Sequence, residues 1–232
     1  MKRLAQSQDI ELQHIHLLDL DGTLVNSARI DNLCYWRAVT EVFDRPEKLR
    51  EPGEFKHVTD SGILQQWCNE TIGQPPDERQ TSAVKCAFVD QLQQAFNRDP
   101  REFEAIRGAR AFLESLMEQP GHALAIATGG WRRSARFKLQ QAGLDDLGLP
   151  LACSDDASSR LGILRHARRL ACSQLTVAGL RDTICYGDAI WDLEASRRLG
   201  ARFIGIANGE AAVQLAAAGA QQVVADYAAM LV

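Results

Sequence analysis

The sequence predicts an α/β protein with a Rossmann-like parallel sheet and a small helical domain inserted after the first strand. The chain has 232 residues, of which 46% are hydrophobic and 24% charged, enough for one core with a smaller insertion. Short apolar runs alternate with longer amphipathic stretches, as in βαβ units around a parallel sheet. From about residue 27 to residue 100 the alternation stops, and only helical patterns remain.

Six apolar runs are expected to form the strands of the sheet. They span 15–18, 123–127, 149–153, 183–186, 202–206 and 222–225. Between them, apolar residues recur with helical spacing, and Gly follows several of these segments, as is usual just past a helix. The helices of the core are therefore expected at 109–118, 131–141, 159–172, 193–199 and 211–217.

The interval without strands contains three helical patterns separated by Pro- and Gly-containing segments. They lie near 30–43, 60–71 and 77–96. An interval of this length is far longer than an ordinary βα loop of about 2–6 residues. We therefore expect a core domain made of 1–26 and 101–232 and a helical domain made of 27–100. Polar linkers near 25–28 and 98–104 are expected to act as hinges.

The charge of the chain argues against a nucleic-acid-binding protein. The formal net charge is −4, and no basic stripe of the kind found in nucleic-acid-binding proteins is present. Two short Arg clusters occur, and we interpret both as solvated helix faces. They are Arg132, Arg133 and Arg136, and Arg165, Arg168 and Arg169.

The six cysteines and the apolar runs bear on the location of the protein. No two cysteines form a CxxC pair, and no Cys/His spacing is typical of a zinc site. The first residues lack the apolar stretch of a signal peptide, and no apolar run approaches the ~20 residues that span a bilayer. We expect a cytoplasmic protein with reduced thiols and no membrane contact.

The clearest chemical signal lies where the first predicted strand ends, in the sequence HLLDLDGTL. Asp19 and Asp21 are two residues apart, so both carboxylates project to the same side at the carboxyl end of a strand. Two carboxylates this close need a cation or a shared proton. Gly22 allows close approach of the backbone to a ligand, and Thr23 adds a hydroxyl group.

Two later strands end in polar residues of a related kind. Thr128 and Gly129 follow a strand and precede a helix, whose N-terminus favours an anion. Asp188 ends another strand, and Asp192 follows at the spacing of one helical turn, so both can face one site. Carboxylates are the ligands that Mg²⁺ takes in proteins, together with water and substrate phosphate.

These segments together resemble the motifs of the haloacid dehalogenase superfamily. DLDGT resembles the first motif, ATGG the second and GDAIWD the fourth. The third motif usually provides a Lys, and Arg160 is the best candidate here, with Asp155 and Asp156 as its possible partners. The helical insertion resembles the small cap of the phosphoglycolate phosphatase-like branch.

The resemblance implies a Mg²⁺-dependent phosphatase that acts on a small phosphorylated metabolite. Asp19 would attack phosphorus, and Asp21 would act as general acid and base. Mg²⁺ would be held by Asp19, the backbone carbonyl of Asp21 and Asp188, with Asp192 nearby. The transferring phosphate would be bound by Thr128, Gly129 and Arg160, although Arg132 and Arg133 could reach it from another side.

Several alternatives remain open. A phosphomutase shares all four motifs, and a non-catalytic phosphate-binding protein could use the same fold, although the intact Asp19 and Asp21 argue against the latter. Asp21 also argues against a dehalogenase, because a departing halide needs no general acid. Within the helical domain, His57 and Asp60 are candidate substrate contacts. The specific substrate and the oligomeric state do not follow from the sequence.

Overall fold

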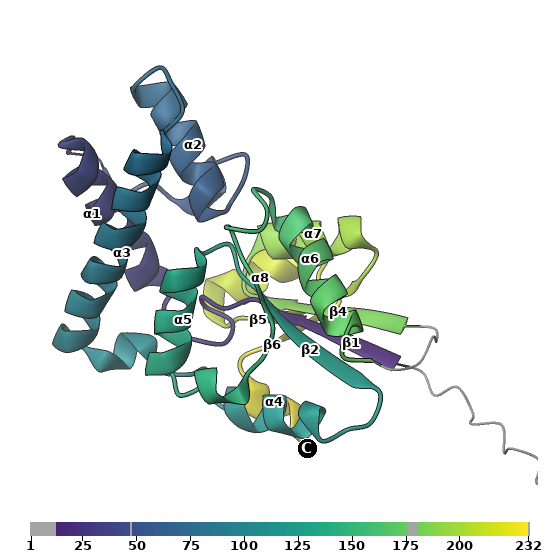
Figure 1. Ribbon diagram of the computed structural model, residues 1–232. Coiled ribbons are helices and arrows are strands. Elements are labelled where there is room, and N and C mark those ends of the chain that lie inside the picture. Colours follow the sequence, from purple (N-terminus) through teal and green to yellow (C-terminus); the bar gives the residue numbers. More distant parts are fainter. Residues whose placement is uncertain (1–12, 47, 176–180, 232) are drawn as a thin grey trace, which may run out of the picture.

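A computed structural model describes residues 13–46, 48–175 and 181–231. At its centre is a parallel sheet of six strands in the order β3-β2-β1-β4-β5-β6 (Figure 1). All six predicted strands are present, with ends that differ from the expected ones by at most two residues. Their bounds are β1 Gln13–Leu18, β2 His122–Ala127, β3 Leu151–Ala152, β4 Arg181–Gly187, β5 Arg202–Ile206 and β6 Gln222–Val224.

The position of β1 in this order places the site. Leu18, the last residue of β1, is paired with Ile126 of β2 on one side and with Tyr186 of β4 on the other. Because all strands are parallel, the residues that follow β1, β2 and β4 leave the sheet at the same edge. The three motifs that lie far apart in the sequence therefore meet there.

The core helices cover both faces of the sheet. One hydrophobic cluster joins Leu18, Leu124 and Ile126 to helices α4 and α5, and another joins Ile15 and Leu17 to α6, α7 and α8. Alternate residues of β1 thus point to opposite faces, as the period of a strand requires. All five predicted core helices are present, and Figure 1 shows α4 and α6 on opposite sides of the sheet. Their bounds are α4 Ala109–Met117, α5 Arg132–Gln141, α6 Arg160–Cys172, α7 Ile190–Leu199 and α8 Gly209–Ala217.

Three helices lie between β1 and β2 in the chain, as predicted: α1 (Ala28–Phe43), α2 (Asp60–Thr71) and α3 (Glu78–Arg98). No strand occurs among the described residues of 27–100. These helices share a hydrophobic cluster that includes Trp67 and Phe88 and also takes in Trp131, at the start of α5. Figure 1 shows the three helices to one side of the sheet, with α3 beside α5. The exact domain boundaries stay a prediction.

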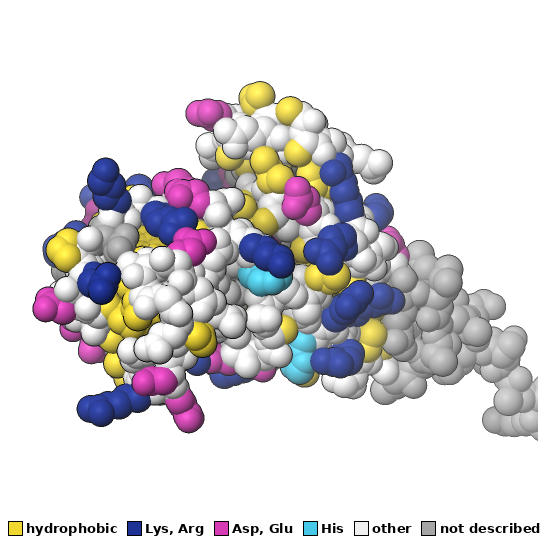
Figure 2. Space-filling model, turned by 90° about the horizontal axis from the view of Figure 1, so that it is seen from above, with side chains coloured by type: hydrophobic (Ala, Val, Ile, Leu, Met, Phe, Trp, Pro, Cys, Tyr) yellow, Lys and Arg dark blue, Asp and Glu magenta, His cyan; other side chains and the backbone are white. Residues whose placement is uncertain are grey.

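Of the first Arg cluster, Arg133 and Arg136 of α5 are exposed, whereas Arg132 is partly buried. Figure 2 shows the molecule from above, and several Lys and Arg side chains gather on the side of this view next to the grey atoms. Separately, Arg165 and Arg169 of α6 are exposed. Within the described residues, no helix has the length and apolar character needed to cross a bilayer. The segment 1–12, on which the absence of a signal peptide was argued, lies outside the described residues.

Candidate active site

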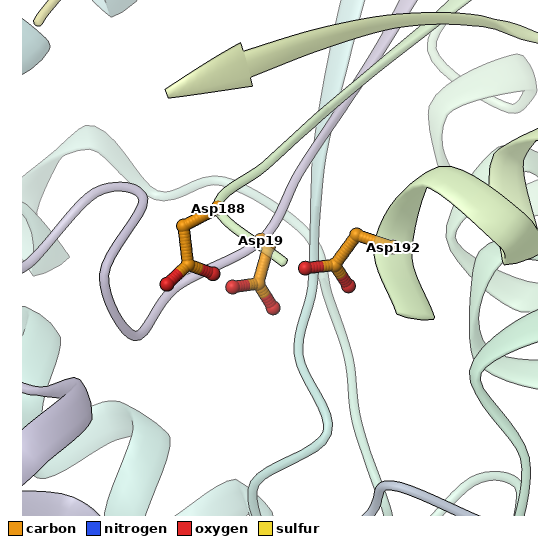
Figure 3. Close-up of side chains that lie close together, drawn as sticks. All are labelled: Asp19, Asp188 and Asp192. Atoms are coloured by element: carbon orange, nitrogen blue, oxygen red, sulfur yellow. The ribbon is translucent and has the colours of Figure 1, made fainter. Parts of the chain in front are cut away.

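Three carboxylates converge at the edge of the sheet where β1 and β4 end. Asp19 directly follows β1, and its backbone N–H donates a hydrogen bond to the carbonyl of Tyr186 at 3.0 Å. Asp188 follows β4, and Asp192 lies in the first turn of α7. One oxygen from each carboxylate lies within 4.8 Å of the others. Figure 3 shows the Asp19 carboxylate between those of Asp188 and Asp192.

This group carries more negative charge than its protein partners neutralise. Burial, with a contribution from the neighbouring Asp192 and against the opposing effect of Arg160, raises the pKa of Asp19 to about 7. Burial also raises the pKa of Asp188 well above its usual value, with Asp19 and Asp192 adding to the shift. The second carboxylate oxygen of Asp192 is buried and has no hydrogen-bond partner within the described chain. An all-oxygen donor set with excess negative charge fits a hard cation such as Mg²⁺.

Arg160 is the cation that lies against this group. Its Nη2 donates to Oδ1 of Asp19 at 2.7 Å and also contacts Oδ1 of Asp192. The Arg160 side chain is 12% exposed, and Arg160 is the first residue of α6. The predicted partners of Arg160 were wrong: Asp155 pairs with Lys85, and Asp156 pairs with Arg132. Both aspartates are exposed in the loop after β3, and they pair there with cations of the surface instead of with the buried Arg160.

Gly22 is required by the position of Asp188. Its backbone has a φ of +78°, a left-handed conformation that side chains disfavour, and a Cβ at this position would lie 2.2 Å from Oδ2 of Asp188. Any larger residue would therefore strain the turn and push the Asp188 carboxylate away from Asp19. The sequence indicated close backbone approach at Gly22 but not which side chain approaches it.

Thr128 and Gly129 follow β2 and line the same pocket as Asp19 and Arg160. The Thr128 hydroxyl is buried and accepts a hydrogen bond from the backbone N–H of Gly130 at 3.0 Å. A Cβ on Gly129 would lie 2.9 Å from Nη1 of Arg160. The absence of a side chain at Gly129 therefore lets the loop approach the guanidinium closely.

Asp21 has a different set of partners from Asp19. Its two oxygens accept from Nζ of Lys138 at 2.6 Å each, and Oδ1 also accepts from the Ser27 hydroxyl at 2.6 Å. Lys138 Nζ is also 2.6 Å from Oδ1 of Asp31. The carboxylate of Asp21 is not part of the three-carboxylate group. The predicted metal contact of Asp21 was its backbone carbonyl, and that contact stays a prediction.

Lys138 is fully buried and was not among the site residues predicted from the sequence. Burial alone would lower its pKa, but Asp21 and Asp31 outweigh burial and raise it. Burial raises the pKa of Asp31 to about 6, with repulsion from Asp21 adding to the effect. The sequence pattern could have indicated this Lys, because Lys138 lies at helical spacing with Ala135 and Leu139 on the buried face of α5. A Lys on a buried face requires an acidic partner.

The pocket over these residues has an empty volume of about 630 Å³, which includes space open to solvent. Asp60, the first residue of α2, lines it; Asp60 accepts from the backbone N–H of Trp131 at 2.8 Å and donates its own N–H to the carbonyl of Gly129 at 2.9 Å. His57 is exposed and does not line the pocket. Arg132 and Arg133 are likewise outside its lining.

Comparison with known proteins agrees with this architecture. A family model described as haloacid dehalogenase-like hydrolase matches residues 16–206. A hydrolase from Pseudomonas syringae has 24% identity and a TM-score of 0.67, with 93% of this chain and 94% of that chain covered. CbbY from Rhodobacter sphaeroides, in complex with phosphate, has 16% identity and a TM-score of 0.67, with 95% and 97% covered.

A third solved structure, named as a predicted phosphoglycolate phosphatase from Haemophilus somnus, has 19% identity and a TM-score of 0.60, with 95% of this chain and 96% of that chain covered. No curated protein matches the chain. At these identities the similar structures establish the fold, and the match to the family model covers most of the chain.

Proposed function

The chain belongs to the haloacid dehalogenase-like hydrolase family, and on that premise we propose that it is a Mg²⁺-dependent phosphatase. Its substrate is a small phosphorylated metabolite, and the reaction passes through an aspartyl-phosphate. The observation that carries the proposal is the convergence of Asp19, Asp188 and Asp192 beside Arg160. Asp19, Asp188 and Arg160 line one pocket with Asp21.

Asp19 is the nucleophile in this proposal. Its carboxylate oxygen attacks phosphorus, a bond forms between the two atoms, and the bond from phosphorus to the alcohol oxygen breaks. The buried Thr23 hydroxyl donates to Oδ2 of Asp19 at 3.2 Å and Arg160 donates to Oδ1, so both oxygens are held in a defined orientation.

Asp21 is the general acid and base. It gives a proton to the departing alkoxide and then takes one from the water that hydrolyses the phosphoenzyme. Lys138 and Ser27 donate hydrogen bonds to its carboxylate, and neither belongs to the three-carboxylate group. These contacts fix the orientation of Asp21 next to the leaving oxygen.

Asp19, Asp188 and the backbone carbonyl of Asp21 would hold Mg²⁺, with Asp192 beside them. The ion would supply positive charge against the phosphate dianion and the carboxylates. Thr128, the backbone at Gly129 and Arg160 bind phosphate oxygens. The phosphate bound to CbbY, which shares the fold, supports a phosphate site in this architecture.

Residues 27–100 form the cap in this proposal, with hinges near 25–28 and 98–104. This segment meets the core through apolar packing on Trp131, through the Lys138–Asp31 ion pair and through polar contacts of the loop before α2. The Ser61 N–H donates to the Ser154 hydroxyl at 2.9 Å, and the Thr59 hydroxyl donates to the carbonyl of Ser158 at 2.9 Å. Such contacts can form and break as substrate enters and product leaves. We also propose that the protein is cytoplasmic.

The test is hydrolysis of an aryl phosphate by the purified protein in the presence of Mg²⁺ and in excess EDTA. We expect phosphate release with Mg²⁺, its loss with EDTA and its recovery when Mg²⁺ is restored. Equal rates in both conditions would exclude the metal assignment. A protein that binds phosphate but hydrolyses no ester would instead be a phosphate-binding protein.

A further inference from the structure

One side of the pocket is built by α1, by α2 and by the loop that joins them. The polar side chains on this side, here called the helical wall, are Asp31, Asn32, Tyr35, Thr59 and Asp60. Within the described residues, neither Lys nor Arg from the segment 27–100 lines this pocket. Arg160, the cation in the lining, comes from the core and lies against Asp19. The helical wall therefore presents no positive charge to a substrate.

The hydrogen-bond donors of the helical wall are directed at the protein itself. The Tyr35 hydroxyl donates to the backbone carbonyl of Asp60 at 2.9 Å, and Nδ2 of Asn32 donates to the carbonyl of Arg50 at 3.1 Å. The Thr59 hydroxyl donates to the carbonyl of Ser158. Each of the three bonds ends on a backbone oxygen, so the wall offers mainly acceptors to the pocket.

The two carboxylates of the helical wall each retain an unpaired oxygen. Asp31 is bonded to Lys138 through Oδ1, and Asp60 to the N–H of Trp131 through Oδ2. In the part of the chain that the structure describes, the other oxygen of each has no hydrogen-bond donor. Asp60 is 7% exposed and lines the pocket. Neither oxygen is among the fully buried atoms that lack a partner, so a ligand that donates a hydrogen bond can reach them.

The charges at this end of the pocket point to a cation. Lys138 is shared by Asp21 and Asp31, and Asp60 lies close enough for its pKa to be raised, first by burial and then by repulsion from Asp31. Among the described residues, no cationic side chain pairs with Asp60, so one ammonium lies near three carboxylates. A carboxylate or a second phosphate on the substrate would add to this excess, whereas an ammonium group would reduce it.

We propose that the leaving alcohol of the substrate carries a protonated amine, which binds Asp60 and Asp31 while the phosphate lies at Asp19. This inference rests on the proposed phosphatase function and specifies its substrate class as aminoalkyl phosphate esters. It also excludes phosphoglycolate as the preferred substrate, because no cation of the helical wall is available to its carboxylate.

The test uses three esters of equal length that differ only at the end remote from the phosphate. They are 2-aminoethyl phosphate, 2-hydroxyethyl phosphate and 2-phosphoglycolate, which carry an ammonium, a hydroxyl and a carboxylate. We expect kcat/KM to fall in that order, by at least about tenfold from the first to the last, because buried like charges reject a ligand. Equal values for the three esters, or a preference for 2-phosphoglycolate, would overturn the inference.

A pair of variants locates the selectivity. Asp60→Asn keeps an oxygen for the Trp131 N–H but removes the charge, and it should reduce the ratio of kcat/KM for the ammonium ester over the carboxylate ester. Asp90→Asn makes the same change at an exposed position of α3 outside the pocket, and the ratio should be unchanged. An unchanged ratio in Asp60→Asn would also overturn the inference.

Failure of the inference is distinguishable from failure of the proposed function. If the aryl phosphate is hydrolysed with Mg²⁺ but the three esters show another order, only the substrate class is wrong. If no ester, the aryl phosphate included, is hydrolysed, the phosphatase assignment itself is wrong.

Discussion

Lys138 offers the sharpest test of how the site is held together. Replacing it with Met keeps most of the volume of the side chain and removes the ammonium. Asp21 and Asp31 then lose a partner that lies 2.6 Å from each, at a position where the Lys side chain has no exposure to water. Removing one partner of a buried ion pair typically costs about 3–5 kcal/mol. The two aspartates are 18% and 17% exposed, so we expect a loss of about 3 kcal/mol, at the lower end of that range.

The loss should depend on pH in a defined direction. Without Lys138, the pKa of Asp31 rises further above the value of about 6 that it has beside the ammonium. The folded variant then binds a proton more tightly than the unfolded chain does, so its stability increases as pH falls. The difference between variant and wild type should therefore be larger at pH 8 than at pH 5.5.

The assay is chemical denaturation followed by circular dichroism at both pH values, with Lys85→Met as the control. Lys85 also pairs with an aspartate, Asp155, but both side chains are about 30% exposed, and such surface pairs contribute about 0–1 kcal/mol. If Lys138→Met lost less than about 1 kcal/mol at pH 8, or no more than Lys85→Met, the buried pairing would not have the energetic role argued here.

Three further predictions concern single residues. Asp19→Asn should abolish turnover and leave the circular dichroism spectrum unchanged, because an amide is a poor nucleophile; a substantial residual rate would show that another group attacks phosphorus. Arg160→Ala should reduce kcat/KM by about 100-fold or more and Arg160→Lys should recover part of it, whereas Arg132→Ala, outside the pocket, should stay near wild type; the reverse pattern would move the phosphate contact to Arg132. Burial, with a contribution from His122, lowers the pKa of His16 from 6.5 to about 3. Below pH 6.5 the unfolded chain therefore binds a proton at this residue that the folded protein does not bind. The free energy of unfolding should fall as pH decreases, by about 2 kcal/mol at pH 5. Denaturation of wild type and His16→Phe at pH 7.5 and pH 5 measures this, and an equal pH dependence of the two proteins would contradict it.

The sequence by itself determined the helices and strands and the parallel, Rossmann-like type of the sheet, whereas the strand order came from the structure. The period of apolar residues reflects contacts between neighbours along one strand or helix, and such contacts are readable from a few adjacent positions. The motifs at the ends of β1, β2 and β4 predicted a common edge because parallel strands end together. In the structure, Asp19, Thr128 and Asp188 line one pocket, and their roles there stay a prediction.

Only the tertiary structure decided which side chains pair within that pocket. Lys138 and Asp21 are 117 residues apart, and no local pattern records that they meet. The same holds for Arg160, whose partners are Asp19 and Asp192 rather than the adjacent Asp155 and Asp156. Contacts of this kind depend on how α5 and α6 pack against the sheet. Local periodicity therefore specifies each element, whereas the charge balance of the site arises only when the elements are packed together.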